Sequence, residues 1–218
     1  LIPHGTDTYV FPHRTFQEYL AACHLLTIKD YPTEAAGLVR KDSGLWQEVF
    51  SLAAGRAARD KRLEAAVDSV QGLCPQALAE CQEGVSAKAV ELAEVAASAL
   101  GEIGQAALAR AELGDKTRKR VEDWLLAGFG ASELLEPKRR HEVGIALADL
   151  GDPRDEVMSV DAMHFCWVPG GDVWLNIDES TPEDGGQLYP ALPNGYWIGR
   201  FPVTVAQFRA YVEATQTK

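Results

Sequence analysis

The fold is decided by residues 11–22, whose sequence is FPHRTFQEYLAA. Thr15 and Glu18 stand three positions apart, which is the spacing of a capping box, where each side chain accepts a hydrogen bond from the other residue's backbone amide. This pattern predicts a helix that begins here. Apolar residues then recur at helical spacing, and we expect them to form one buried stripe of Phe16, Tyr19, Leu20 and Cys23.

The residues ahead of this helix predict a β-hairpin. Residues 9–11 have the composition of a short strand, and residues 5–7, Gly-Thr-Asp, are typical of a turn. His13 therefore falls between a strand and a helix. Such a histidine either only hydrogen-bonds the backbone of its turn or is free to bind a ligand, and the residue pattern alone leaves both open.

This unit resembles the end of the winged-helix domain of NACHT-type signal-transduction NTPases. In that family a segment F-x-H-x-(S/T)-F-Q-E-(Y/F)-L-A-A closes the nucleotide-binding module, and its histidine contacts the β-phosphate of bound ADP. The resemblance implies this role for His13. A Trp-x-x-Val pair that often follows in the family is matched by Trp46 and Val49. The main match covers Phe11, His13, Thr15, Phe16, Gln17, Glu18, Tyr19, Leu20, Ala21 and Ala22.

Nucleotide hydrolysis by these residues alone is not expected, because the chain contains no G-x-x-x-x-G-K-(S/T) phosphate loop. The chain also begins without methionine, inside the predicted hairpin. If the resemblance holds, we expect a fragment of a longer protein, with ATP or ADP and Mg²⁺ bound in an upstream module. Self-association of the full-length protein is then possible, and no cofactor is expected in this chain.

Composition limits the remaining functions. The 218 residues carry a net charge of -11, and 46% of them are hydrophobic, which predicts a folded, acidic protein. The acidity argues against nucleic-acid binding, so we expect the cluster Lys138-Arg139-Arg140 to be a solvated helix face. No apolar run is long enough for a membrane span, and no N-terminal signal is present. Together with cysteines that form no C-x-x-C motif, this predicts a cytoplasmic protein.

Residues 29–150 are predicted to be helical throughout. The sequence A-L-x-x-(I/L)-G occurs at residues 99–104 and again at 146–151, 47 positions later, a spacing found in HEAT-type helical repeats. The alternative is two unrelated helices that both end at glycine. The expected helices and their faces are 45–53; 57–70 with Leu63, Ala66, Val67 and Val70; 76–82; 87–100, capped by Ser86, with a small-residue face of Ala89, Ala93, Ala96, Ala97 and Leu100; 117–127 with Val121, Trp124 and Leu125; and 137–150 with Val143, Ala146, Leu147 and Leu150.

A change in composition at residue 151 predicts a domain boundary. Gly151 and Pro153 end the last helix, and three of the five tryptophans lie beyond this point. Residues 1–150 carry 17 basic and 22 acidic side chains, whereas residues 151–218 carry 4 and 10. We therefore predict the end of a winged-helix domain at 1–28, a HEAT-like helical array at 29–150 and a small α+β domain at 151–218.

The final segment is predicted to contain strands at 163–168, 172–175 and 196–200 and a helix capped by Thr204. The first two strands are expected to form a hairpin around residues 169–171. Cys166 is expected in a core strand, and His164 is expected to be a strand residue whose ring is hydrogen-bonded within the fold. Residues 176–186 are expected to be a loop. Its acidic residues lack calcium-loop spacing, which favours a solvated loop over a metal site; they are Asp178, Glu179, Glu183 and Asp184.

This order resembles the start of a formylglycine-generating-enzyme-like domain, which has a C-type-lectin-like fold. The resemblance implies a module that recognises a protein or small ligand. The family's copper-binding cysteine pair lies beyond the matched part, so we do not expect this chain to be an enzyme by itself. The matching residues are Val168, Pro169, Gly170, Gly171, Trp197, Ile198, Arg200, Pro202, Val203, Thr204, Gln207 and Phe208.

Three functions follow from these patterns. The first is a sensor or regulatory segment of a bacterial NACHT-type NTPase, in defence or stress signalling, that couples a ligand at the C-terminal domain to the nucleotide state of the upstream module. The second is a helical-repeat scaffold for a protein partner. The third is an accessory and N-terminal part of a formylglycine-generating oxidase, which requires reactive cysteines downstream.

Overall fold

The computed structural model is mainly helical, with short two-stranded antiparallel sheets, as the sequence predicts for the fold class. It divides into two compact units, Leu1–Asp152 and Pro153–Lys218. The residues described are 2–3, 9–11, 13–74, 76–81, 84–131, 133–175, 187–192 and 194–216. The expected turn at 5–7 and the acidic loop at 176–186 lie outside them.

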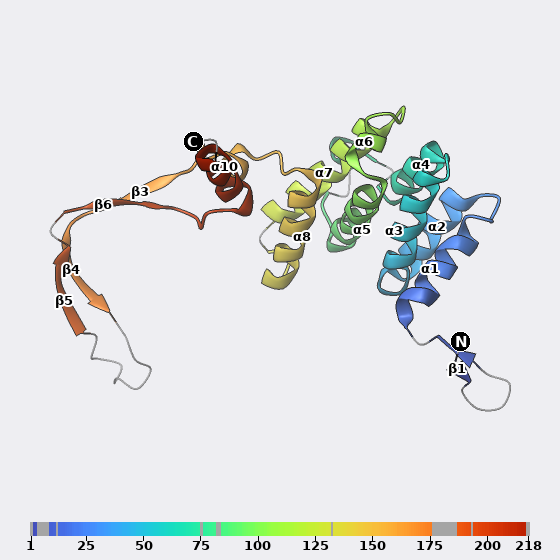
Figure 1. The fold of residues 1–218 in the computed structure, drawn as a ribbon, viewed down its shortest axis with the longest axis horizontal. Helices are drawn as coiled ribbons and strands as arrows, with labels where there is room; N and C mark the ends of the chain where they lie inside the picture. Colours follow the sequence, from blue (N-terminus) through green and yellow to red (C-terminus); the bar gives the residue numbers. More distant parts are fainter. Residues whose placement is uncertain are drawn as a thin grey trace. The chain divides into compact units, whose positions relative to one another are not determined.

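The first unit is an array of helices stacked in two layers (Figure 1). In one layer α1 packs on α3, α3 on α5 and α5 on α8, and in the other α2 packs on α4 and α4 contacts α7. The bounds are β1 Ile2–Pro3, β2 Tyr9–Val10, α1 Arg14–Leu25, α2 Tyr31–Lys41, α3 Ser43–Arg59, α4 Leu63–Leu73, a 3₁₀ turn Leu78–Glu80, α5 Ala87–Ile103, α6 Gln105–Leu108, α7 Gly114–Gly130 and α8 Pro137–Leu150.

Successive helix pairs are related by a nearly constant shift along the sequence. Hydrogen bonds join Ser51 to Ser98, Gln71 to Thr117 and Trp124 to the carbonyl of Gln76, at separations of 47, 46 and 48 residues. Both glycines of the A-L-x-x-(I/L)-G sequences end a helix with positive φ, 85° and 89°. The glycine caps are therefore confirmed, and the stacked pairs keep the spacing that the repeated sequence predicts.

The core consists largely of small side chains. On α5 the predicted alanine face is buried almost as expected, and Ser86 caps the helix by accepting a hydrogen bond from the amide of Ala89 at 3.2 Å. Small residues let helix axes approach closely. The predicted face of α7 is buried at Val121, Trp124 and Leu125. The predicted face of α8 is buried at Val143, Leu147 and Leu150 and partly buried at Ala146.

The prediction for the first helix is wrong in two respects. The helix begins at Arg14 after His13, whose side chain makes no capping bond, and Glu18 pairs with Arg14 at 2.6 Å instead of closing a capping box with Thr15. The expected buried stripe is largely exposed, with Phe16 at 57% and Leu20 at 51%. The helix packs on its neighbours through another face, that of Ala22 and Leu25.

Two further helix predictions are corrected. The expected helix 57–70 is interrupted at 60–62, because Lys61 takes a positive φ of 62° that ends α3 before α4 begins. The expected helix 76–82 is only a 3₁₀ turn over its described part. The boundary expected at residue 28 does not separate units, since α1 packs on both α2 and α3.

The second unit combines two helices with a two-stranded ribbon. The expected hairpin of 163–168 with 172–175 is wrong: β3 pairs with β6, and β4 pairs with β5. Residues 169–170 join β3 to β4, and the two strand pairs follow one another along the chain, as Figure 1 shows. Cys166 is exposed, not in a core. The bounds are α9 Asp155–Met158, β3 Phe165–Val168, β4 Gly171–Leu175, β5 Gln187–Leu192, β6 Tyr196–Gly199 and α10 Val205–Gln216.

A reciprocal cap holds α10, as the sequence predicts for Thr204. The Gln207 amide donates to the Thr204 hydroxyl at 3.2 Å, and the Thr204 amide donates to the Gln207 side-chain carbonyl at 3.0 Å. Buried Gln207 also donates its Nε2 to the carbonyls of Glu156 and Ser159. These bonds attach α10 to α9, so the cap also serves as a tertiary contact.

The close approach of α5 and α7 can be tested at Gly128. A Cβ added there would lie 2.5 Å from Cγ2 of the buried Val90. We expect Gly128→Ala to lower the free energy of unfolding by about 1–2 kcal/mol, because overpacking outweighs the better helix propensity of alanine. Gly37→Ala in α2 is the matched control, since its added Cβ meets nothing within 4 Å. Chemical denaturation of both variants measures this, and equal stabilities would contradict it.

Candidate functional site

His13 lies at the N-cap position of α1, in extended backbone conformation. Its side chain is exposed, and its ring lies 5.9 Å from the ring of Phe16, measured between centroids. Its backbone carbonyl accepts the Phe16 amide at 3.2 Å. Since the imidazole does not cap the helix, the ring is free to contact another molecule, whereas the backbone-bonding alternative has no capping bond to support it.

The exposed residues around His13 form one continuous helical face. His13, Phe16, Gln17 and Leu20 stand at helical spacing i, i+3, i+4 and i+7, and all four are exposed. We call these four residues the α1 face. Tyr19 borders it and accepts a hydrogen bond from Arg56 of α3 at 2.5 Å. The residues of the NACHT-like sequence thus lie mainly on the surface rather than in the core of the array.

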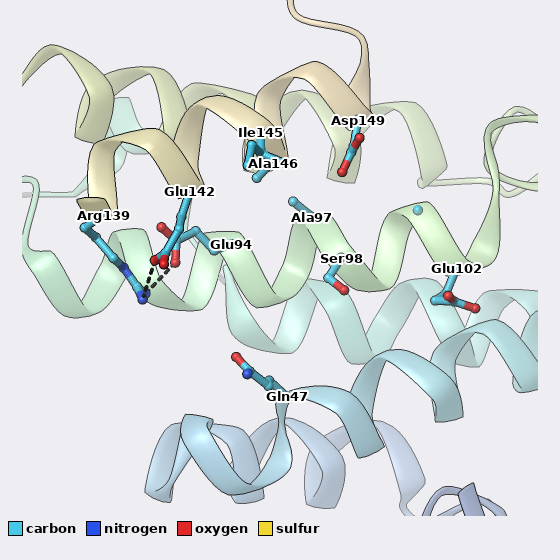
Figure 2. Close-up of a pocket in the computed structure, with 11 residues that line it drawn as sticks. Gln47, Glu94, Ala97, Ser98, Glu102, Arg139, Glu142, Ile145, Ala146 and Asp149 are labelled. Atoms are coloured by element: carbon cyan, nitrogen blue, oxygen red, sulfur yellow. Dashed lines mark hydrogen bonds and ion pairs between the residues drawn. The ribbon is translucent and has the colours of Figure 1, made fainter. Parts of the chain in front are cut away.

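A second candidate is a groove of about 570 Å³ in the first layer of the array. Gln47 of α3 lies on one side, α5 contributes the floor, and α8 forms the other side (Figure 2). Figure 2 shows two groups of charged side chains, one toward each end. The lining is Gln47, Glu94, Ala97, Ser98, Gly101, Glu102, Arg139, Glu142, Ile145, Ala146 and Asp149.

An ion-pair cluster occupies one end of this groove. Arg139 of α8 pairs with Glu94 of α5, and its other terminal nitrogen lies 3.5 Å from Glu142. The Glu94 side chain is only 14% exposed, and its Oε1 atom is buried without a hydrogen-bond partner. Burial raises the pKa of Glu94 to about 7, because Arg139 only partly offsets desolvation and Glu142 and Glu91 add repulsion.

The basic cluster at residues 138–140 is not the solvated face that the sequence predicts. Arg139 belongs to the ion-pair cluster, and the guanidinium of Arg140 lies 5.6 Å from the ring centroid of Phe129. Only Lys138 is exposed. Two of the three basic side chains therefore hold α8 to its neighbours.

The cysteines do not gather into a site. Cys23, Cys74, Cys81 and Cys166 are free thiols. Burial raises the pKa of Cys74 to about 12, so this thiol is unreactive and behaves as a small apolar side chain. Within the described residues, no three histidine, cysteine or acidic side chains come together as metal ligands. In the same part of the chain, no helix combines the length and hydrophobicity that a membrane crossing needs.

The sequence singles out His13 as a candidate contact, but it predicts Phe16 and Leu20 of the α1 face to be buried and gives no indication of the groove. The groove's ion pair joins Glu94 to Arg139, which lies 45 residues later in the chain, and no local sequence pattern predicts this contact. The one available signal is the A-L-x-x-(I/L)-G sequence, which ends both α5 and α8. If its two copies mark successive helix pairs, these two helices are expected to stack on each other. Scans against known protein families, curated protein sequences and solved structures found no match for this chain.

The raised pKa of Glu94 predicts a specific pH dependence of stability. Because the folded state holds this proton more tightly than the unfolded state, stability from this group is present below the ordinary pKa of 4.5 and is lost as pH rises toward about 7. We therefore expect the free energy of unfolding of Glu94→Gln to rise relative to that of the unaltered protein between pH 5 and pH 8. Urea denaturation across this range measures it.

Glu34→Gln, a charge loss on an exposed residue of α2, is the control for this experiment. If the difference between Glu94→Gln and the unaltered protein has the same value at every pH, Glu94 is not the titrating group.

Proposed function

We propose that this chain is a regulatory segment of a NACHT-type signal-transduction NTPase. In this proposal the helical array, of HEAT-like type, connects a nucleotide-sensing end at α1 to a ligand-recognising C-terminal module. The observation that carries the proposal is the α1 face. Residues that match the family sequence lie outward from a helix whose other side is packed in the array.

Physical chemistry supports a contact at this face. Large apolar side chains grouped on the surface mark an interaction site more often than single exposed ones do. A helix N-terminus also favours negative charge, because its first amides and its dipole point toward a phosphate. His13 stands at that N-terminus, and α1 has no acidic residue in its first turn to compete with an anion.

The proposed mechanism is a shift between two states. In the closed state the α1 face packs on the nucleotide-binding module, and His13 contacts the β-phosphate of ADP. A protein or small ligand bound by the second unit favours an open, self-associating state. Its effect is limited by the difference in its affinity for the two states.

The second unit supplies features of a recognition module. Trp167 and Trp197 face each other across β3 and β6, with ring centroids 5.3 Å apart, and Trp197 is 64% exposed. Aromatic side chains at such positions provide contact area for a binding partner. The lectin-like assignment of this unit is part of the proposal and rests on the sequence resemblance.

The role of His13 is tested in the protein that carries the nucleotide-binding module. His13→Ala should speed ADP release by about tenfold, since a hydrogen bond to a charged group contributes roughly 1.5 kcal/mol. Release of a fluorescent ADP analogue measures this. His24→Ala, an exposed histidine near the other end of α1, is the control. Equal release rates for both variants would remove His13 from the nucleotide site.

A separate test addresses the apolar part of the α1 face. Phe16→Ser with Leu20→Ser should change the free energy of unfolding of the array by no more than about 0.5 kcal/mol, because both side chains are mostly exposed. The same double variant should weaken the association of this chain with the separately expressed nucleotide-binding module. Isothermal titration calorimetry measures the affinity, and unchanged affinity would show that the α1 face is not the contact.

A further inference from the structure

The groove between α3, α5 and α8 has an apolar centre and acidic ends. Ala97 and Ala146 contribute to its centre, and Ile145 on the α8 side is 50% exposed. Its charged side chains are four acidic residues and one arginine. An occupant that complements this lining therefore has an apolar side chain between positive charges.

The two ends differ in how their charges are neutralised. Glu94 and Glu142 share Arg139, as described above. Glu102 of α5 and Asp149 of α8 are both exposed, and no ion pair joins either of them to a basic residue in the described part of the chain. Figure 2 shows both at the end away from Arg139. This end of the groove therefore keeps two negative charges available to a partner.

A buried acceptor gives a separate indication that the groove takes an occupant. The Oε1 atom of Glu94 is buried without any hydrogen-bond donor. Leaving such an atom unpaired costs free energy, more for a charged group than for a neutral one. A donor brought by a bound partner, or a small shift of Arg139 as a partner binds, would satisfy it.

We propose that this groove binds a basic segment of a partner protein. An apolar side chain of the segment packs on Ala97, Ala146 and Ile145, and a lysine or arginine lies between Glu102 and Asp149. The groove follows α5 from Glu94 to Glu102, about 12 Å at the helical rise per residue, so an extended segment of roughly four residues spans it. This inference is independent of the nucleotide-sensing role of α1.

The test uses the full chain and a short fluorescein-labelled peptide in which leucine and lysine alternate. Fluorescence anisotropy measures its affinity. The double variant Glu102→Gln/Asp149→Asn should bind the peptide about fivefold more weakly, the effect of removing two exposed ion pairs. Glu34→Gln/Asp68→Asn, which makes the same charge change on exposed residues of α2 and α4, should bind as the unaltered chain does.

A second peptide separates groove binding from general attraction to an acidic protein. Replacing its leucines by serine keeps the charge but removes the apolar anchor, and we expect binding to fall by at least tenfold. Equal weakening by both double variants, or equal affinity for both peptides, would overturn the proposal. So would the absence of measurable binding of the leucine-containing peptide to the unaltered chain.

Discussion

The array depends on how closely α5 approaches the helices around it. Alanines on α5, and glycines such as Gly128 and Gly55 on its neighbours, remove the side chains that would hold these helices apart. Close approach sets the distance between α5 and the helices that pack on it. Larger side chains at these positions would increase that distance and so change the surfaces that the array presents.

Two surfaces follow from this packing, and they differ in kind. The α1 face lies on the first helix of its layer, on the side that no other described helix covers, and it combines two large apolar side chains, Phe16 and Leu20, with two polar ones. The groove lies inside the same layer, where polar and charged side chains line the space between α3, α5 and α8. An apolar end face is suited to a large, lasting contact, whereas a charged groove is suited to a short segment that binds and leaves.

The sequence predicts those parts of the fold that local chemistry controls. The Ser86 and Thr204 caps, the glycine ends at 104 and 151 and the buried faces of α5, α7 and α8 follow from patterns within a few residues. Features set by distant partners are missed. Whether Phe16 and Leu20 are buried depends on which element covers α1. The pairing of β3 with β6 joins strands separated by more than twenty residues of sequence. The Glu94–Arg139 pair forms only because two separate helices stack. A period-3.6 stripe shows which side of a helix is apolar, but not whether another element lies on it.

The proposal that α1 completes a nucleotide-binding module can be tested by reading the coding sequence ahead of Leu1. We expect a strand, a G-x-x-x-x-G-K-(S/T) loop and a helix upstream, followed by a second strand that ends in an acidic residue for Mg²⁺. An upstream sequence with no phosphate loop would contradict this proposal. The match at residues 11–22 would then be coincidental, and the array would be a scaffold whose function lies in its groove.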